Sequence, residues 1–237
     1  MTPEAKAREQ IDKKLQESGW VIQDIKTLNL TVALGVAVCE FQTSTGPVDY
    51  ALFVDGVPVG VAEAKKDEKG AVLTGVEGQS GRYANSRFKW VKQEYRIRFV
   101  YEATGKLVHF TDYADIKCRS REIFSFHRPE TLKRWLNESD TVRNSLKQLP
   151  PLDETGFRKC QIKAIHGLDN SFANNRPHAL VQMATGAGKT FTAITAAYRL
   201  LKYGRMNRIL FLVDTRSLGE QAEREFLAYK PNDDPRN

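Results

Sequence analysis

The chain has 237 residues, a hydrophobic content of 41% and a formal net charge of +7. This composition fits a soluble globular protein of one large or two modest domains, and the basic charge favours a polyanionic partner. No apolar run reaches the ~18 residues of a membrane span, and the charged N-terminus is not typical of a secretory signal. Three scattered cysteines without a CxxC pair suggest neither zinc nor disulfides, so we expect a cytoplasmic protein.

The first part of the chain predicts a helix followed by several strands. The predicted elements are a helix at 3–18, strands at 48–54 and 58–64, a helix at 71–90, strands at 96–104 and 106–113, and a helix at 131–147. Pro3 suits the first turn of the first helix, and Gly19 is a typical residue to end it. Asp55 and Gly56 predict a turn between the first two strands.

The pattern changes after a stretch with a double proline, "QLPPLDETG" at 148–156, which we interpret as a linker. The segments that follow are helices at 158–168, 189–202 and 218–229, with apolar strands at 178–184 and 208–214. Alternation of strands and helices predicts a parallel α/β sheet. We therefore divide the chain into domains at 1–147 and 157–237, joined by the linker.

The segment "MATGAGKT" at 183–190 lies between an apolar strand and a helix, which is the setting of a phosphate-binding loop. Gly186 and Gly188 let the backbone come close to a phosphate, and successive N–H groups at the start of the helix favour an anion. Lys189 is expected to reach the β- and γ-phosphates, and Thr190 to bind the Mg²⁺ of a nucleotide.

Met183 stands where the full GxxxxGK[ST] pattern has glycine, and the shorter TGxGKT form resembles superfamily 2 helicases and translocases. "FRKCQIKAI" at 157–165 resembles the segment whose glutamine contacts adenine, here Gln161, and "LFLVDTRSLGEQA" at 210–222 resembles the next helicase motif. The expected ATP-binding residues are Gln161, Thr185, Gly186, Ala187, Gly188, Lys189 and Thr190. The sequence ends at Asn237 before a DExH-type acid is reached, so we expect no ATP turnover by this chain alone.

The stretch "VDYALFVDGVPVGVAEAKK" contains an Asp…Glu-x-Lys pattern. Phosphodiester hydrolysis needs a hard divalent metal, which prefers oxygen ligands, and a cation that stabilises developing charge. Asp49 and Glu63 would bind Mg²⁺ together with the backbone carbonyl of Ala64, and Lys65 would assist the reaction. The alternative is that these are solvated charges at strand ends.

Strand register tests this hypothesis. If Asp55 and Gly56 formed a two-residue turn in a regular hairpin, Asp49 would lie opposite Ala62 and face away from Glu63. An odd-length loop with Gly56 in a left-handed conformation, or a bulge, would return Asp49 and Glu63 to a common face. The nuclease hypothesis therefore predicts such an irregularity, and disfavours a simple two-residue turn.

Downstream, "QSGRY" places Gln79 and Tyr83 one helical turn apart. Together with Asp49 and the Glu63–Lys65 pair they match the QxxxY branch of the PD-(D/E)xK nucleases, in which these residues position DNA and the catalytic groups. The alternative is an ordinary polar pair on a helix surface. The stretch 82–98 is rich in basic and aromatic residues and is compatible with phosphate contacts or with a solvated face.

Taken together, residues 1–147 resemble the nuclease domain, and residues 157–237 the start of the translocase, of the restriction subunit of type I restriction–modification enzymes. The resemblance implies a PD-(D/E)xK α/β core with a mixed sheet, followed by the first part of a RecA-like P-loop domain. It implies a type I site-specific deoxyribonuclease that uses Mg²⁺ and ATP. Its partners would be double-stranded DNA and the methylation and specificity subunits, with no membrane.

Some relatives in this family add an acid from the first helix, for which Glu4, Glu9 and Glu17 are all candidates. Two other functions remain open. The chain could be a non-catalytic module that docks on DNA or on the complex. It could also be a superfamily 2 helicase whose N-terminal domain only binds DNA, in which case Asp49, Glu63 and Lys65 would not converge.

Overall fold

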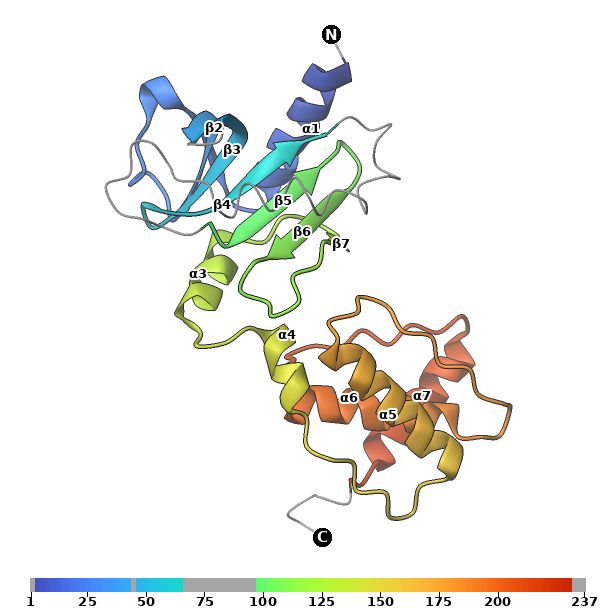
Figure 1. The fold of residues 1–237 in the computed structure, drawn as a ribbon. Helices are drawn as coiled ribbons and strands as arrows, with labels where there is room; N and C mark the ends of the chain where they lie inside the picture. The colour runs from blue at the N-terminus through green and yellow to red at the C-terminus, as the bar shows by residue number, and fades with distance from the viewer. Residues whose placement is uncertain (1–2, 44–45, 66–96, 232–237) are drawn as a thin grey trace. The chain divides into compact units, whose positions relative to one another are not determined.

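The computed structural model describes residues 3–43, 46–65 and 97–231, with side chains from residue 7 onward. The chain forms two compact units, residues 1–139 and 140–237, and each is described by itself (Figure 1). By this division the predicted linker at 148–156 lies inside the second unit. In the part of the chain that the structure describes, no helix is long and apolar enough to cross a membrane.

The first unit is built on a mixed seven-stranded sheet whose strands follow chain order, β1-β2-β3-β4-β5-β6-β7. The strands are β1 Val21–Asp24, β2 Gly35–Thr43, β3 Gly46–Val54, β4 Val57–Ala64, β5 Phe99–Ala103, β6 Val108–Asp112 and β7 Arg121–Ile123. The β1–β2 and β4–β5 pairs are parallel and the others antiparallel. The predicted strands correspond to β3, β4, β5 and β6, whereas β1, β2 and β7 were not predicted.

Two helices, α1 (Pro3–Glu17) and α3 (Pro129–Asn137), contribute to the main core, and a short 3-10 turn, η1 (Ile25–Thr27), follows β1. Ile11 and Leu15 of α1 and Leu132 of α3 are fully buried in one cluster with the inward residues of β3, β4, β5 and β6. Gly19 has φ +87, as its predicted role at the end of α1 requires.

The predicted helix at 131–147 is wrong in one respect, because it is two helices. α3 ends at Asn137, and α4 (Val142–Ser145) begins after Thr141, whose hydroxyl accepts a hydrogen bond from the backbone N–H of Asn144. This side-chain cap satisfies a donor that a continuous helix would have paired internally, so it fixes a new helix start. The predicted helix at 71–90 lies outside the described residues.

The second unit is helical in its described residues. It contains α4, the 3-10 turn η3 (Leu146–Gln148), α5 (Lys159–Ala173), α6 (Lys189–Lys202) and α7 (Arg216–Ala228). The predicted parallel sheet is not found, because the segments 178–184 and 208–214 form no strand. Leu180 is 95% exposed and Leu210 is 80% exposed. A parallel strand needs hydrogen-bonded neighbours and helices over both faces, and these two apolar segments have no ladder within the described residues.

Candidate functional site

The hairpin of β3 and β4 sets the geometry of the candidate metal site. Asp55 and Gly56 form a two-residue turn with φ values of +55 and +74, closed by the pair Val54↔Val57. The expectation that this turn would not be a two-residue one is wrong. Left-handed φ at both central residues is typical of a type I′ turn, which matches the twist of the strands.

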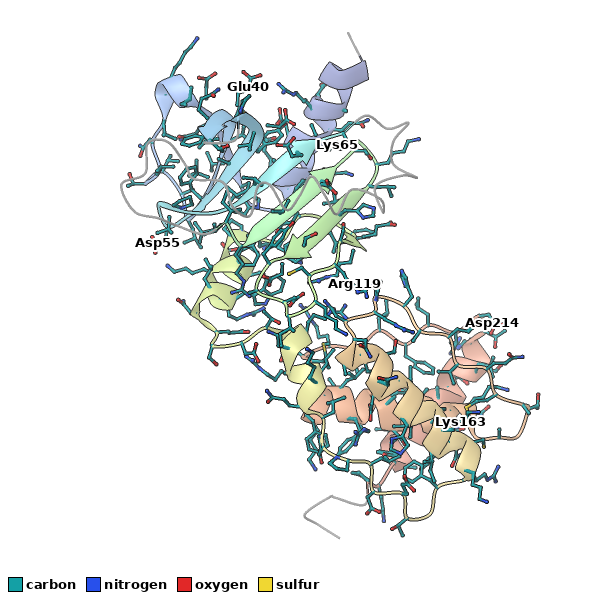
Figure 2. The ribbon with its side chains drawn as sticks, viewed as in Figure 1. Glu40, Asp55, Lys65, Arg119, Lys163 and Asp214 are labelled. Atoms are coloured by element: carbon teal, nitrogen blue, oxygen red, sulfur yellow. The ribbon has the colours of Figure 1, made fainter. Side chains whose placement is uncertain are left out.

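The predicted irregularity lies further along the hairpin. The pairing shifts between Leu52↔Gly60 and Phe53↔Pro58, so that Val59 is an extra residue in β4. The ladder then continues to Tyr50↔Ala62. One further step in this register sets Asp49 opposite Glu63, which is the arrangement that the bulge was predicted to produce. Figure 2 shows Lys65 at the end of the sheet away from Asp55.

The two oxygens of the Asp49 carboxylate have different partners. Oδ2 accepts a hydrogen bond from the backbone N–H of Ala64 at 2.9 Å, and Oδ1 accepts one from Nη2 of Arg8. Next to Ala64, the Lys65 ammonium lies 4.0 Å from Oε2 of Glu63. These side chains are mostly buried, with Asp49 20%, Glu63 11% and Lys65 22% exposed. The structure thus brings Asp49, Glu63 and Lys65 to one place.

Sequence reasoning missed Arg8 and Glu40. Arg8 of α1 donates from Nη1 to Oε1 of Glu40 at 2.9 Å while its other amino group contacts Asp49. The hydrogen bond to Glu40 raises the pKa of the Arg8 guanidinium above its ordinary value, so it is charged at any working pH. Glu40 itself has φ +50 inside β2. The Asp…Glu-x-Lys pattern reveals neither residue, because Arg8 belongs to α1 and Glu40 to β2, both outside the segment that carries the pattern.

Of the three candidate acids in the first helix, the structure describes the side chains of Glu9 and Glu17. Glu17 pairs with Lys13 at 3.9 Å on the exposed side of α1, and Glu9 is exposed. The side chain of Glu4 lies outside the described residues. Asp12 instead accepts a hydrogen bond from the Tyr50 hydroxyl at 2.7 Å, one turn after Arg8.

A further carboxylate that was not predicted lies beside Glu63. Glu102 of β5 is the parallel partner of Glu63, and it is buried. Burial raises the pKa of the Glu102 carboxyl, and the positive charge of Lys65 partly offsets this increase. The neighbouring β6 residue in register is His109, whose pKa is lowered by burial. The polar residues therefore continue across the sheet from the β3–β4 hairpin.

The residues present suit a hard divalent cation. Asp49, Glu63 and the carbonyl of Ala64 offer oxygen ligands at one strand end, whereas the positive charge of Arg8 against Asp49 opposes a cation there. Among the described residues no group of three or more His, Cys, Asp or Glu side chains forms a metal cluster. A bound Mg²⁺ would accordingly keep several water ligands.

Gln79 and Tyr83 lie outside the described residues, as does most of the basic stretch 82–98. Arg98, at its end, is held inside the first unit. It donates to both oxygens of Asp112 at 2.9 Å and to the carbonyl of Trp135 at 2.7 Å. This bidentate buried pair stabilises the fold and leaves Arg98 unavailable to DNA phosphates.

In the second unit, the predicted phosphate loop precedes α6, which begins at Lys189. Gly186 has φ +76 and Gly188 has φ +84, conformations that a side chain would strain. Nζ of Lys189 donates to the carbonyl of Ala184 at 3.4 Å, across the loop formed by Thr185, Gly186, Ala187 and Gly188. Thr190 follows in the first turn of α6, at the position expected for a Mg²⁺ ligand.

Both the oxygen and the nitrogen of the Gln161 amide have hydrogen-bond partners within the protein. Its Oε1 accepts from the backbone N–H of Arg158 at 2.9 Å, and its Nε2 donates to the carbonyl of Ala187 at 3.2 Å. Arg158, which was not predicted, donates to the carbonyl of Gly186 at 2.7 Å. Arg158 and Gln161, at the start of α5, thus contact the loop backbone, and the stated hydrogen bonds of Gln161 are to backbone groups of Arg158 and Ala187.

Two family models match the chain. Residues 32–136 match the model described as the second domain of the type I restriction enzyme EcoKI endonuclease subunit. Residues 154–236 match the model described as the res subunit of type III restriction enzymes. The first contains Asp49, Glu63 and Lys65, and the second contains the phosphate loop.

The curated relatives are endonuclease subunits of type I restriction enzymes. The EcoKI subunit of Escherichia coli K12 is 30% identical over 99% of this chain and 24% of its own length. The EcoAI subunit of E. coli is 28% identical over 71% of this chain, and a Staphylococcus saprophyticus subunit is 26% identical over 75%. The chain spans 20–24% of the length of these relatives.

A solved fragment of an HsdR subunit of a type I restriction enzyme from Vibrio vulnificus YJ016 aligns with 88% of this chain and 39% of its own, at 19% identity and a TM-score of 0.41.

Proposed function

This chain is a relative of the endonuclease subunits of type I restriction enzymes, and on that premise we propose that its first unit is a Mg²⁺-dependent DNA endonuclease. The observation that carries the proposal is the register of β3 and β4, which sets Asp49 opposite Glu63 beside Lys65. A helicase with a purely DNA-binding first domain would not need these three side chains to converge.

In this proposal Asp49, Glu63 and the Ala64 carbonyl hold the metal. A bound Mg²⁺ polarises the phosphate and activates water. The Ala64 N–H fixes the orientation of the Asp49 carboxylate through Oδ2. Lys65 lies on the same strand face as Glu63, two residues on, where its ammonium stabilises negative charge developing on the phosphate oxygens. Gln79 and Tyr83 are proposed to orient the DNA and the catalytic groups.

For the second unit we propose nucleotide binding at the phosphate loop. Support comes from the left-handed glycines, the start of α6 at Lys189, and the family match over residues 154–236. In the longer relatives the same unit would begin an ATP-driven DNA translocase working with methylation and specificity subunits.

The test compares three proteins: wild type, Lys65→Ala, and Lys13→Ala as a matched control from the exposed side of α1. Nicking and linearisation of supercoiled DNA are measured with Mg²⁺ or Mn²⁺, with the chain alone and with added methylation and specificity subunits and ATP. Loss of one charge-stabilising group should lower the cleavage rate by about 10²- to 10³-fold in Lys65→Ala, with Lys13→Ala unchanged.

Equal cleavage by wild type and Lys65→Ala would contradict the proposed catalytic role of this site. Metal-independent binding of DNA without cleavage under either condition would favour the non-catalytic module. One observation favours this non-catalytic module. In the second unit the apolar segments 178–184 and 208–214 are exposed and form no strand pairing within the described residues.

A further inference from the structure

Arg8 contacts the one oxygen of Asp49 that the backbone leaves available. Oδ2 is held by the Ala64 N–H, and Oδ1 is held by the Arg8 guanidinium. A metal ion that takes Asp49 as a ligand meets the positive charge of Arg8 on the same carboxylate, so it shares Asp49 with Arg8 at an electrostatic cost or displaces it. We propose that Arg8 competes with the metal ion for Asp49 and keeps this carboxylate occupied until a divalent cation displaces it.

The guanidinium has a second partner that suits this role. Arg8 also donates to Glu40 at 2.9 Å, and Glu40 lies on β2, opposite Asp49 in the register that runs through Cys39↔Tyr50 and Phe41↔Val48. Arg8 can therefore give up Asp49 and remain paired through its other amino group. A lysine would have to serve both carboxylates from a single nitrogen, because it lacks the two separate amino groups of the planar guanidinium.

The backbone of Glu40 supports the same inference. Its φ of +50 in the middle of a strand is rare for a residue with a Cβ, because the Cβ crowds the neighbouring backbone there. Such conformations persist where the surrounding structure imposes them, often at functional sites. Here the left-handed conformation accompanies a carboxylate that contacts Arg8 beside the candidate metal site.

This inference rests on the proposed metal site, and the test separates the two. Mn²⁺ binding to the 237-residue chain is measured by calorimetry for wild type, Arg8→Gln, Arg8→Lys, Asp49→Asn and the control Lys13→Gln. Asp49→Asn preserves the acceptor for the Ala64 N–H but removes the charge, and it should weaken Mn²⁺ binding at least tenfold. Thermal unfolding without metal checks that each variant is folded.

Arg8→Gln should bind Mn²⁺ about three- to tenfold more tightly than wild type, because an ion pair at a half-exposed site no longer has to be broken. The Mn²⁺ affinity of Arg8→Lys should lie between those of wild type and Arg8→Gln. The gain should shrink at high salt, where the repulsion between the guanidinium and the metal is screened. Lys13→Gln removes the same charge from the same helix and should match wild type.

Unchanged or weaker Mn²⁺ binding in Arg8→Gln, with binding lost in Asp49→Asn, would overturn the competition and leave the metal site standing. A similar gain in Lys13→Gln would also overturn it, because the effect would then be one of net charge. Mn²⁺ binding that is indifferent to Asp49→Asn would overturn the metal site and the competition together.

Discussion

The carboxylate of Asp49 accepts a hydrogen bond from the backbone N–H of Ala64 at 2.9 Å. The β3–β4 ladder runs as far as the pair Tyr50↔Ala62, so a side chain makes the contact between the strands immediately beyond it. This contact orients Asp49 toward the strand end where Glu63 and Lys65 lie. The candidate site therefore lies at the end of the hairpin, and its geometry depends on strand pairing.

The left-handed backbone at Glu40 predicts that glycine is more stable than alanine at this position, the reverse of the usual order in a strand. Because glycine adopts positive φ without cost, Glu40→Gly should be more stable than Glu40→Ala by about 1 kcal/mol in urea unfolding. The control is Gln42, an exposed neighbour in the same strand, which is not among the residues with positive φ. There glycine should be less stable than alanine by about 0.5–1 kcal/mol. The same order of stability at both positions would contradict the assigned conformation.

The contacts of Gln161 predict how its loss affects nucleotide binding. Since its amide holds Arg158 and the loop carbonyl of Ala187, Gln161→Ala should loosen the phosphate loop and weaken ATP and GTP equally, by about 2- to 10-fold. Competition with a fluorescent nucleotide measures both affinities, and Lys163→Ala, an exposed change on the same helix, is the control. A loss confined to ATP would instead show that Gln161 recognises adenine.

Burial of His127 predicts a pH dependence of stability. Its Nδ1 lies 2.9 Å from the Tyr101 hydroxyl, and burial, aided by Arg121, lowers the pKa of the imidazole from 6.5 to about 4. Between these values the unfolded chain binds more protons than the native one, so stability is complete above pH 6.5 and falls as the pH drops toward 4. Through His127 the free energy of unfolding should fall by up to roughly 3 kcal/mol over this range.

Urea unfolding of the chain between pH 4.5 and 7.5 measures this effect. His127→Gln should have a flatter pH dependence than wild type, whatever its absolute stability. His166→Gln is the control, because His166 is exposed and its Nε2 lies 2.9 Å from the Glu154 carboxylate. Parallel curves for wild type and His127→Gln would show that His127 does not make this contribution.

Much of the first unit could be predicted from local pattern. Helical spacing of Ile11 and Leu15 predicted α1, and alternation around Asp55 and Gly56 predicted β3 and β4, because these patterns repeat within a few residues. β1 and β7 are too short to show an alternating pattern in the sequence, and they form through pairing with neighbouring strands. In the second unit, local pattern was a poor guide. The apolar runs at 178–184 and 208–214 predict strands, but they form no sheet, because a sheet requires hydrogen-bonded partner strands.

By itself the sequence determined which chemical groups are present: Asp49, Glu63 and Lys65 at strand spacing, and a Gly-rich loop before Lys189. It also required an irregularity if the acids were to meet. Only the tertiary structure decided that the irregularity is the extra residue Val59, and that Arg8 lies between two carboxylates. Register and ion pairs join residues that are distant in the chain, so local periodicity carries no information about them.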